Sequence, residues 1–219
     1  MLIVIGGVLD RHEAAAMREA ADRLPYEDGR RTAGRYAREV KHNEQAAASP
    51  ERDALLEKVR DALIRNEVFQ AAARPRKFAR MLVSRYRPGM EYGFHVDDPI
   101  IAGSRTDLSF TLFLSDPGAY EGGGLLIDDV IDERVIRLDP GDMVLYPTSA
   151  LHQVEPVTRG ERVAVVGWVT SWVRDAARRE VLFDLDEAAR ASFAAHGKTA
   201  AFDRLCKAKS NLYRMWADG

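Results

Sequence analysis

Hydrophobic and polar residues alternate with a period of two in the middle of the chain, most clearly over residues 108–114. Side chains of a strand point to its two faces in turn, so this alternation predicts a strand whose faces differ. Turn-forming sequences recur nearby, at residues 116–118, 122–124, 139–142 and 158–160. Further strands are predicted between them, at about 124–128, 134–138, 142–146 and 162–172. Many short strands at this spacing favour a β-sandwich or barrel over alternating strands and helices.

The first 70 residues predict a short strand followed by helices. Residues 2–5 are apolar and predict the strand. Asp10, with Glu13 three positions later, has the sequence of a capping box that begins a helix. A second helix is predicted to begin at Ser49, because apolar residues then recur every three or four positions to about Phe69.

The rest of the chain completes the predicted organisation. Residues 28–48 are polar and predict a loop, whereas residues 174–219 return to helical spacing. We therefore predict a mainly β protein with flanking helices (α+β). It divides into an N-terminal helical region at 1–75, a β domain at 76–174 and a C-terminal helical extension at 175–219.

The composition is that of a globular protein and excludes several classes of partner. The 219 residues are 46% hydrophobic and 30% charged, unlike a disordered or collagen-like chain. With 34 acidic and 32 basic residues the net charge is −2. The protein as a whole therefore has no electrostatic attraction for nucleic acid or anionic membranes. No apolar stretch is long enough for a membrane span. Cys206 is the single cysteine and cannot form an intramolecular disulfide, which favours a reducing cytoplasm.

Two histidines and an aspartate have the spacing of a metal site. His95 and Asp97 lie two positions apart, so on a strand their side chains would point to one face. His152 follows 57 residues later in the same region of short strands. Two histidines and one carboxylate are the ligands of non-haem Fe(II) in the facial-triad arrangement, which leaves open coordination positions. The alternative is a surface strand pair and an unrelated loop histidine.

Arg162 adds an anion-binding group to this pattern. It lies ten residues after His152, and its neighbours on one strand face are Ala164, Val166 and Trp168, all apolar. Burying a guanidinium on such a face is costly unless it meets an anion, and its fork suits a carboxylate. The sequence therefore favours a dicarboxylic cosubstrate that binds the metal at one end and Arg162 at the other. A side chain at the sheet edge that reaches solvent is the alternative.

Taken together, these motifs resemble the iron(II)/2-oxoglutarate dioxygenase superfamily, and more narrowly the bacterial PKHD-type hydroxylases, which are relatives of prolyl hydroxylases. The superfamily shares the His-x-Asp pair, the distal histidine and the arginine about ten residues beyond it. The matching segments are Arg85-Tyr86-Arg87-Pro88-Gly89 through Asp97, residues 105–115, Tyr120-Glu121-Gly122-Gly123, residues 141–147, residues 151–154, residues 159–164 and the helical tail near 211–216.

The resemblance implies a fold and a reaction. The fold is a double-stranded β-helix (jelly roll) with helices packed outside it. The reaction is an oxidation of a substrate C–H by O₂, coupled to decarboxylation of 2-oxoglutarate to succinate. His95, Asp97 and His152 would hold Fe(II), Arg162 would hold 2-oxoglutarate, and L-ascorbate would re-reduce the iron. Tyr86 lies where prolyl hydroxylases place a tyrosine near the cosubstrate; a barrel-filling aromatic is the alternative. The prime substrate stays open between small molecules and peptides.

The chain departs from the family pattern at two positions. Gly124 stands where the family usually has Glu, which affects substrate contacts or a local ion pair rather than the iron ligands. Ala164 stands two residues after the arginine, where the superfamily often has Ser, so one hydrogen bond to the cosubstrate is absent.

Other candidate residues have mainly structural interpretations. A basic run before the metal strand predicts a solvated face, with an anionic substrate surface as the alternative; it comprises Arg74, Arg76, Lys77, Arg80, Arg85 and Arg87. Trp168 and Trp172 are predicted to share one strand face in the core, with a substrate platform as the alternative. Asp98 is predicted to face away from Asp97. His12, His42 and His196 are predicted to lie on the surface.

Two other functions fit the same fold. A metal-binding jelly roll could act as a sensor or regulator without turnover, but such a site has no need for Arg162. A nucleic-acid demethylase is disfavoured by the balanced charge and by the absence of interleaved stacking residues.

Overall fold

The computed structural model describes the whole chain except residues 129–132 and 219, and its framework is a pair of antiparallel sheets. The larger sheet has the order β1-β13-β9-β16-β5-β4-β2, and the smaller has the order β12-β11-β14-β6-β3. In the larger sheet the strands are β1 (Ile3–Ile5), β13 (Met143–Pro147), β9 (Leu108–Phe113), β16 (Arg162–Ser171), β5 (Pro75–Tyr86), β4 (Glu44–Ala46) and β2 (Tyr26–Asp28). In the smaller sheet they are β12 (Glu133–Ile136), β11 (Leu125–Asp128), β14 (His152–Val154), β6 (Glu91–His95) and β3 (Lys41–His42).

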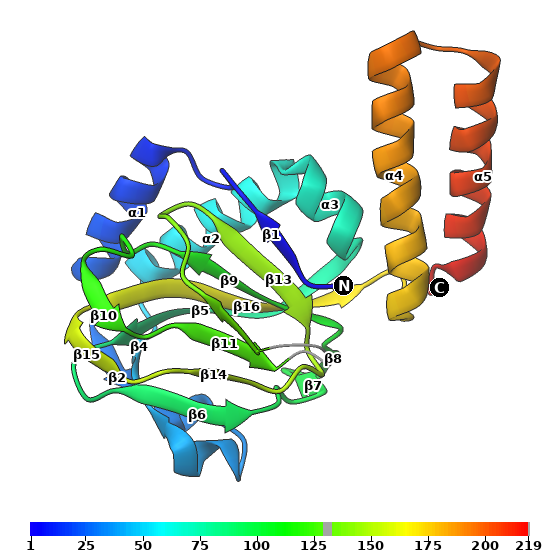
Figure 1. Ribbon diagram of the computed structural model, residues 1–219. Helices are drawn as coiled ribbons and strands as arrows, with labels where there is room; N and C mark the ends of the chain where they lie inside the picture. Colours follow the sequence, from blue (N-terminus) through cyan, green and yellow to red (C-terminus); the bar gives the residue numbers. More distant parts are fainter. Residues whose placement is uncertain (129–132, 219) are drawn as a thin grey trace.

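The two sheets lie face to face as a jelly roll, with β11, β14 and β6 in one layer against β9, β16 and β5 in the other (Figure 1). Two short ribbons close the ends, β10 (Tyr120–Gly122) with β15 (Val157–Gly160) and β7 (Ile100–Ile101) with β8 (Ser104–Arg105). Sequence alternation predicted the strands around 108–114, 124–128, 134–138, 142–146 and 162–172, and all are confirmed within a few residues.

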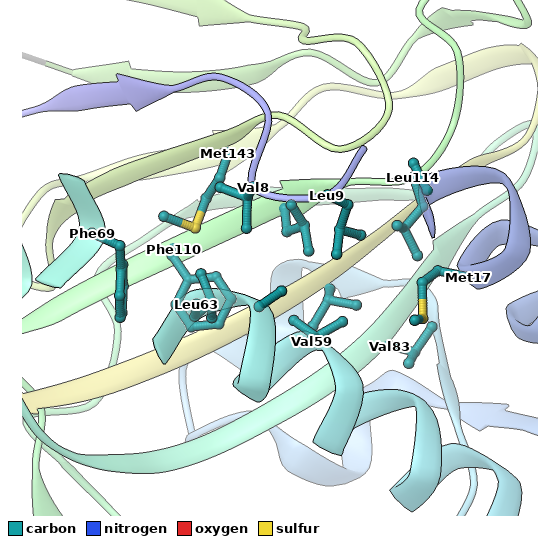
Figure 2. Packing of buried hydrophobic residues seen from close by; sticks show 14 of the residues in the cluster. Val8, Leu9, Met17, Val59, Leu63, Phe69, Val83, Phe110, Leu114 and Met143 are labelled. Atoms are coloured by element: carbon teal, nitrogen blue, oxygen red, sulfur yellow. The ribbon is translucent and has the colours of Figure 1, made fainter. Parts of the chain in front are cut away.

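Three helices cover the outer face of the larger sheet: α1 (Arg11–Asp22), α2 (Pro50–Arg65) and α3 (Glu67–Ala73). Figure 2 shows Val59 and Leu63 of α2 packed with Phe69 of α3 against Phe110 of β9 and Val83 of β5. This apolar cluster is the main core, and it lies on the side of the sheet opposite the smaller sheet. The sheet is therefore supported by burial that does not involve the space between the two sheets.

A helical hairpin of α4 (Ala176–His196) and α5 (Ala200–Trp216) projects from the sandwich, as Figure 1 shows. The predicted C-terminal helices are thus confirmed. Their base contacts the core through the salt bridge of Arg74 with Asp186, the ring of Tyr213 lies against Arg74, and α3 packs on α4. Within the described residues no helix is both long and apolar enough to cross a bilayer.

The N-terminal region confirms one sequence prediction and corrects two. Asp10 and Glu13 form the predicted capping box at α1. The second predicted helix ends earlier than Phe69, because Asn66 leaves helical geometry and its side chain caps a new helix, α3. The predicted loop at 28–48 is only partly a loop. It contains the short helical turns η1 (Gly29–Thr32) and η2 (Ala37–Val40) and the strands β3 and β4, which extend both sheets.

Candidate metal centre

His95, Asp97 and His152 meet between the two sheets. His95 ends β6 and His152 begins β14, and these residues are directly paired in the antiparallel register. Asp97 follows two residues after the strand ends, and one ligand atom from each of the three side chains lies within 4.8 Å of the others. The Asp97 carboxylate is 3.9 Å from His95 Nε2 and 3.7 Å from His152 Nε2. The predicted constellation is therefore assembled in space.

Backbone carbonyls fix the orientation of both imidazole rings. His95 Nδ1 lies 2.8 Å from the Gly93 carbonyl, and His152 Nδ1 lies 2.9 Å from the Ala150 carbonyl. Donation from Nδ1 leaves the Nε2 lone pair of each ring directed at Asp97, which is the tautomer that a metal requires. Burial, with His152 beside it, lowers the pKa of His95 to about 4, so this ring is neutral at pH 7.

Further side chains hold His95, Asp97 and His152 in place. Ser109 Oγ donates a 2.7 Å hydrogen bond to Asp97 Oδ2 and lies 3.2 Å from Thr148 Oγ1. Tyr92 stacks on the His95 ring with a centroid separation of 3.5 Å and an interplanar angle of 13°. Tyr146 contacts the edge of His152. Such contacts restrict the ligand side chains to one geometry before a metal binds.

Arg162 is a buried cation with no counter-ion among the described residues. Its side chain is 1% exposed, and its Nε, Nη1 and Nη2 atoms have no hydrogen-bond partner among the described residues. Tyr86 lies directly opposite on β5, and the Arg162 guanidinium is 5.4 Å from the Tyr86 ring and 5.2 Å from the Phe113 ring. An unpaired buried guanidinium is costly, so this geometry fits an anion that the protein itself does not supply.

One cavity of about 250 Å³ joins these groups. It is lined by the three clustered residues, by Arg162 and Tyr86, and by alternate residues of β5 and β16. A volume of this size takes a small dicarboxylate together with part of a second molecule. The donor set of two imidazoles and one carboxylate with an anion site in the same cavity suits Fe(II) and an acidic cosubstrate.

Comparison with known proteins decides the family. Residues 81–170 match the 2OG-Fe(II) oxygenase superfamily, and residues 175–218 match the PKHD-type hydroxylase C-terminal domain. A PKHD-type hydroxylase of Maricaulis maris is 50% identical over 218 residues, covering all of both chains. The chain belongs to the PKHD-type hydroxylases. It is therefore an oxygenase of the superfamily that uses Fe(II) and 2-oxoglutarate, as the sequence predicted.

Solved structures of prolyl hydroxylases have the same fold as this PKHD-type hydroxylase. One is a prolyl hydroxylase from Trichoplax adhaerens in complex with a peptide of hypoxia inducible factor. It has a TM-score of 0.57 and 16% identity, covering 83% of this chain and 86% of its own. A viral collagen prolyl hydroxylase from Paramecium Bursaria Chlorella virus-1, in a 2OG complex, has a TM-score of 0.52 and 21% identity. That match covers 78% of this chain and 96% of its own. These similarities confirm the predicted jelly-roll core.

Trp168 of β16 and Trp172, which directly follows that strand, correct a prediction of the sequence. Trp168 lines the cavity, and its buried indole Nε1 has no partner among the described residues. Trp172 is 37% exposed, beneath the guanidinium of Arg76. Neither belongs to the core on a shared face, because register shifts after Trp168 and after Thr170 interrupt the alternation of the strand.

The basic run is also not the solvated face that we expected. Arg74 pairs with Asp186 and is mostly buried, and Arg85 is 9% exposed and pairs with Glu44 at 2.7 Å. The other members differ: Arg76, Lys77 and Arg87 are exposed, and Arg80 lines the cavity. Arg74 and Arg85 are paired with carboxylates of helix α4 and strand β4, which lie far away in the sequence. The linear sequence shows only a cluster of positive charges.

Six further positions can be compared with their predictions. Asp98 is exposed, but it lines the same cavity as Asp97 and does not face away from it; His12, His42 and His196 are exposed as predicted. Position 124 does not line the cavity: a Cβ there would lie 2.5 Å from Glu155 Oε2 and 2.5 Å from Val135 Cγ1. In this chain the Glu155 carboxylate therefore lies beside position 124, where the family usually has Glu. Ala164 is fully buried.

Sequence reasoning missed Ser109, Thr148, Tyr92 and Lys41, which surround the three ligands. Ser109 was detectable, because it is a polar residue in a strand that is buried on both faces. Lys41 was not, because it reaches the cavity only through the pairing of β3 with β6, where Lys41 lies opposite Tyr92.

Proposed function

We propose that His95, Asp97 and His152 bind Fe(II) and that Arg162 binds the distal carboxylate of 2-oxoglutarate. The single observation that carries this proposal is the Arg162 guanidinium, which is buried, charged and unpaired in the cavity that contains the three ligands. The spacing also fits, because Arg162 and the ligands lie at separate points of one cavity. A sensor site would have no use for this buried cation.

Tyr86 is proposed to contact the same cosubstrate. It is directly opposite Arg162 in the β5–β16 ladder, and burial raises the pKa of its phenol. A phenol that stays protonated donates a hydrogen bond to a carboxylate. Ser84 and Asn43 lie within hydrogen-bonding reach of Tyr86 and orient its hydroxyl.

The roles of the chain's own residues follow from these positions. Bound Fe(II) and 2-oxoglutarate supply the oxidising chemistry with O₂, including decarboxylation of 2-oxoglutarate to succinate. The histidines at the ends of β6 and β14, with Asp97 two residues beyond β6, would fix the geometry of the bound metal. Arg162 orients the cosubstrate, and the apolar neighbours Leu82, Leu125 and Val166 exclude water from the cavity.

The proposal extends to the prime substrate, the reductant, the location and the domain division. The prime substrate is a small molecule or a peptide, since the prolyl hydroxylase of similar fold from Trichoplax adhaerens binds a peptide fragment. Family membership supports L-ascorbate as the reductant of the iron. The single cysteine supports a cytoplasmic location. The β16–α4 junction and the start of β5 support a division into 1–75, 76–174 and 175–219.

An anaerobic spectroscopic titration tests the metal site. Fe(II) with 2-oxoglutarate is expected to give a weak visible charge-transfer band in the parent protein. His152→Ala removes one imidazole and is expected to abolish the band, whereas His42→Ala removes an exposed histidine outside the cavity and keeps it. A full-strength band in His152→Ala would show that the distal ligand is misassigned. Turnover of 2-oxoglutarate with candidate substrates, checked by mass spectrometry for added oxygen, then tests the reaction.

A further inference from the structure

The cavity has a second cationic group besides Arg162, formed by Lys41 and Arg80. Both residues line it, and among the residues that the structure describes neither forms an ion pair. By contrast, Arg85 on the same strand and Arg74 just before that strand are both paired with carboxylates. The iron site and the proposed 2-oxoglutarate anchor do not account for these two charges.

Burying the Lys41 ammonium in the cavity wall costs free energy, because the charge loses most of its hydration. It is 6% exposed, its ammonium lies 4.8 Å from the centroid of the Tyr92 ring, and it donates a long hydrogen bond of 3.3 Å to Thr32 Oγ1. Burial lowers the pKa of Lys41 to about 8, Asp97 acts in the opposite direction, and Arg80 adds repulsion. The positive charge of Arg80 in the same cavity therefore disfavours a second cation at Lys41.

Arg80 lies at the metal end of the cavity, away from Arg162. In the larger sheet Arg80 is directly opposite Trp168, and Trp168 is directly opposite Ser109, which hydrogen-bonds Asp97. Arg162 lies six residues earlier on β16 than Trp168, a span of about 20 Å at roughly 3.3 Å per residue. Arg80 is thus level with Ser109 and the proposed metal ligands, and it is well separated along the strands from the proposed 2-oxoglutarate anchor.

The charge balance of the filled site leaves these cations unmatched. Formal charges of Fe(II), 2-oxoglutarate, Asp97 and Arg162 cancel when all are present. Among cavity-lining carboxylates only Asp98 then remains against Lys41 and Arg80, and it is exposed at the rim. Trp168 adds an indole N–H without a partner to the same wall. Donors and positive charge therefore exceed acceptors where the prime substrate would lie.

We propose that the prime substrate is an anion, and that its carboxylate or phosphate group is bound by Lys41 and Arg80 beside the metal. This inference rests on the proposed function, because it assigns Arg162 to 2-oxoglutarate and leaves the opposite end for the substrate. Lys41 and Arg80 come from different sheets, and together they would select anionic compounds. Neutral analogues would be excluded because they leave both cations unpaired.

The test is a binding titration that needs no knowledge of the natural substrate. The full chain is labelled with ¹⁵N, loaded with Zn(II) in place of Fe(II) and saturated with 2-oxoglutarate so that Arg162 is occupied. The probes are benzoate, phenyl phosphate and the neutral benzamide. The readout is the indole N–H signal of Trp168, one of three tryptophans in the chain, assigned with Trp168→Phe.

We expect benzoate or phenyl phosphate to shift this signal saturably, and their relative affinities distinguish a carboxylate site from a phosphate site. Benzamide is expected not to bind. Lys41→Met keeps the apolar stem over Tyr92, and Arg80→Gln keeps a polar side chain; each is expected to weaken anion binding about 10-fold or more. Lys41→Arg retains the charge and is expected to recover part of the binding. Lys77→Gln removes a charge from the same strand outside the cavity and is expected to bind like the parent.

Three results would overturn the inference: no saturable binding of either anion, equal binding of benzamide, or unchanged anion binding in the Lys41→Met/Arg80→Gln double variant. The Fe(II)–2-oxoglutarate absorption band, recorded first on the same preparation, separates this outcome from failure of the proposed function. A normal band without anion binding contradicts only the anion site. Absence of the band contradicts the assignment of the metal and cosubstrate residues.

Discussion

Arg162 is the largest fully buried side chain among the described residues, and no carboxylate of the described chain neutralises it. Two aromatic rings, Tyr86 and Phe113, give its guanidinium some favourable contact. Such contacts replace only part of the lost hydration. A protein retains a charge of this kind at a functional site, where a ligand completes the interaction.

Substitution of Arg162 should therefore affect the cosubstrate and spare the metal. Truncating one partner of a buried charge pair costs about 2–5 kcal/mol, which is roughly 30-fold to several thousand-fold in affinity. We expect Arg162→Ala to raise the 2-oxoglutarate dissociation constant by this amount, with Fe(II) binding nearly unchanged. Arg162→Lys should recover only part of the affinity, because an ammonium lacks the fork geometry.

Titration of both variants with 2-oxoglutarate at fixed Fe(II), under anaerobic conditions, measures this effect. Thermal unfolding of the metal-free variants checks that each is folded. If Arg162→Ala bound 2-oxoglutarate like the parent, the anchor would lie elsewhere in the cavity, and Tyr86 with another basic residue would be the better candidate.

At the scale of the elements, the sequence predicted strands better than their interruptions. The alternation around Leu108 and the turn sequences between strands are local signals, and the strands formed where they indicated. Strands β3 and β4 were missed because they have two and three residues and are stabilised by pairing with β6 and β5. The bulges near Trp168 likewise depend on the partner strand, so the faces of the two tryptophans could not be read from spacing alone.

The break between α2 and α3, at Asn66, is another feature that sequence periodicity did not predict. Apolar spacing continues through Asn66, so periodicity alone predicts one helix. Asn66 instead adopts φ −77° and ψ 111°, and its side chain accepts a 2.9 Å hydrogen bond from the Phe69 backbone N–H. The new direction brings the fully buried Phe69 ring against Phe78 and Phe110.

Asn66→Ala should accordingly destabilise the fold by loss of this cap. The expected cost is about 0.5–2 kcal/mol, or a decrease in Tm of roughly 2–4 °C per kcal/mol for a chain of this size. Asn66→Asp keeps a capping oxygen at the helix N-terminus and should be close to the parent. Calorimetry of the metal-free protein measures both, and an unchanged Tm in Asn66→Ala would mean that tertiary packing alone sets the break.

At the scale of the whole molecule, the candidate site was predictable in part. His95, Asp97, His152 and Arg162 were identified because their types and spacings match a recognisable pattern, and the fold brings them to one cavity. The opposite cationic wall was not predictable. Lys41 reaches it from the N-terminal region through β3, more than fifty residues before His95, and only the assembled sheets place it there.

The larger sheet has the main apolar core on one side and the proposed metal site on the other, so removal of the metal should leave the core intact. The main apolar core lies between this sheet and helices α1–α3 (Figures 1 and 2). The proposed ligands lie on the other side, between the sheets. A zinc finger unfolds without its ion because it has little other burial. Here the core does not include the ligands, so the protein should stay folded when metal is removed.

Chelated protein is therefore expected to unfold in one cooperative thermal transition. Adding Fe(II) anaerobically should raise the Tm, because binding to the native state contributes about 2.7 kcal/mol at a hundred times the dissociation constant. The same addition should leave the Tm of His152→Ala almost unchanged, since that variant lacks one ligand, while His42→Ala should respond like the parent. Loss of any cooperative transition on chelation would show that the ligand cluster is part of the folding core. Retention of the transition without an iron-dependent shift would instead show that Fe(II) does not bind the native protein, which contradicts the proposed metal site.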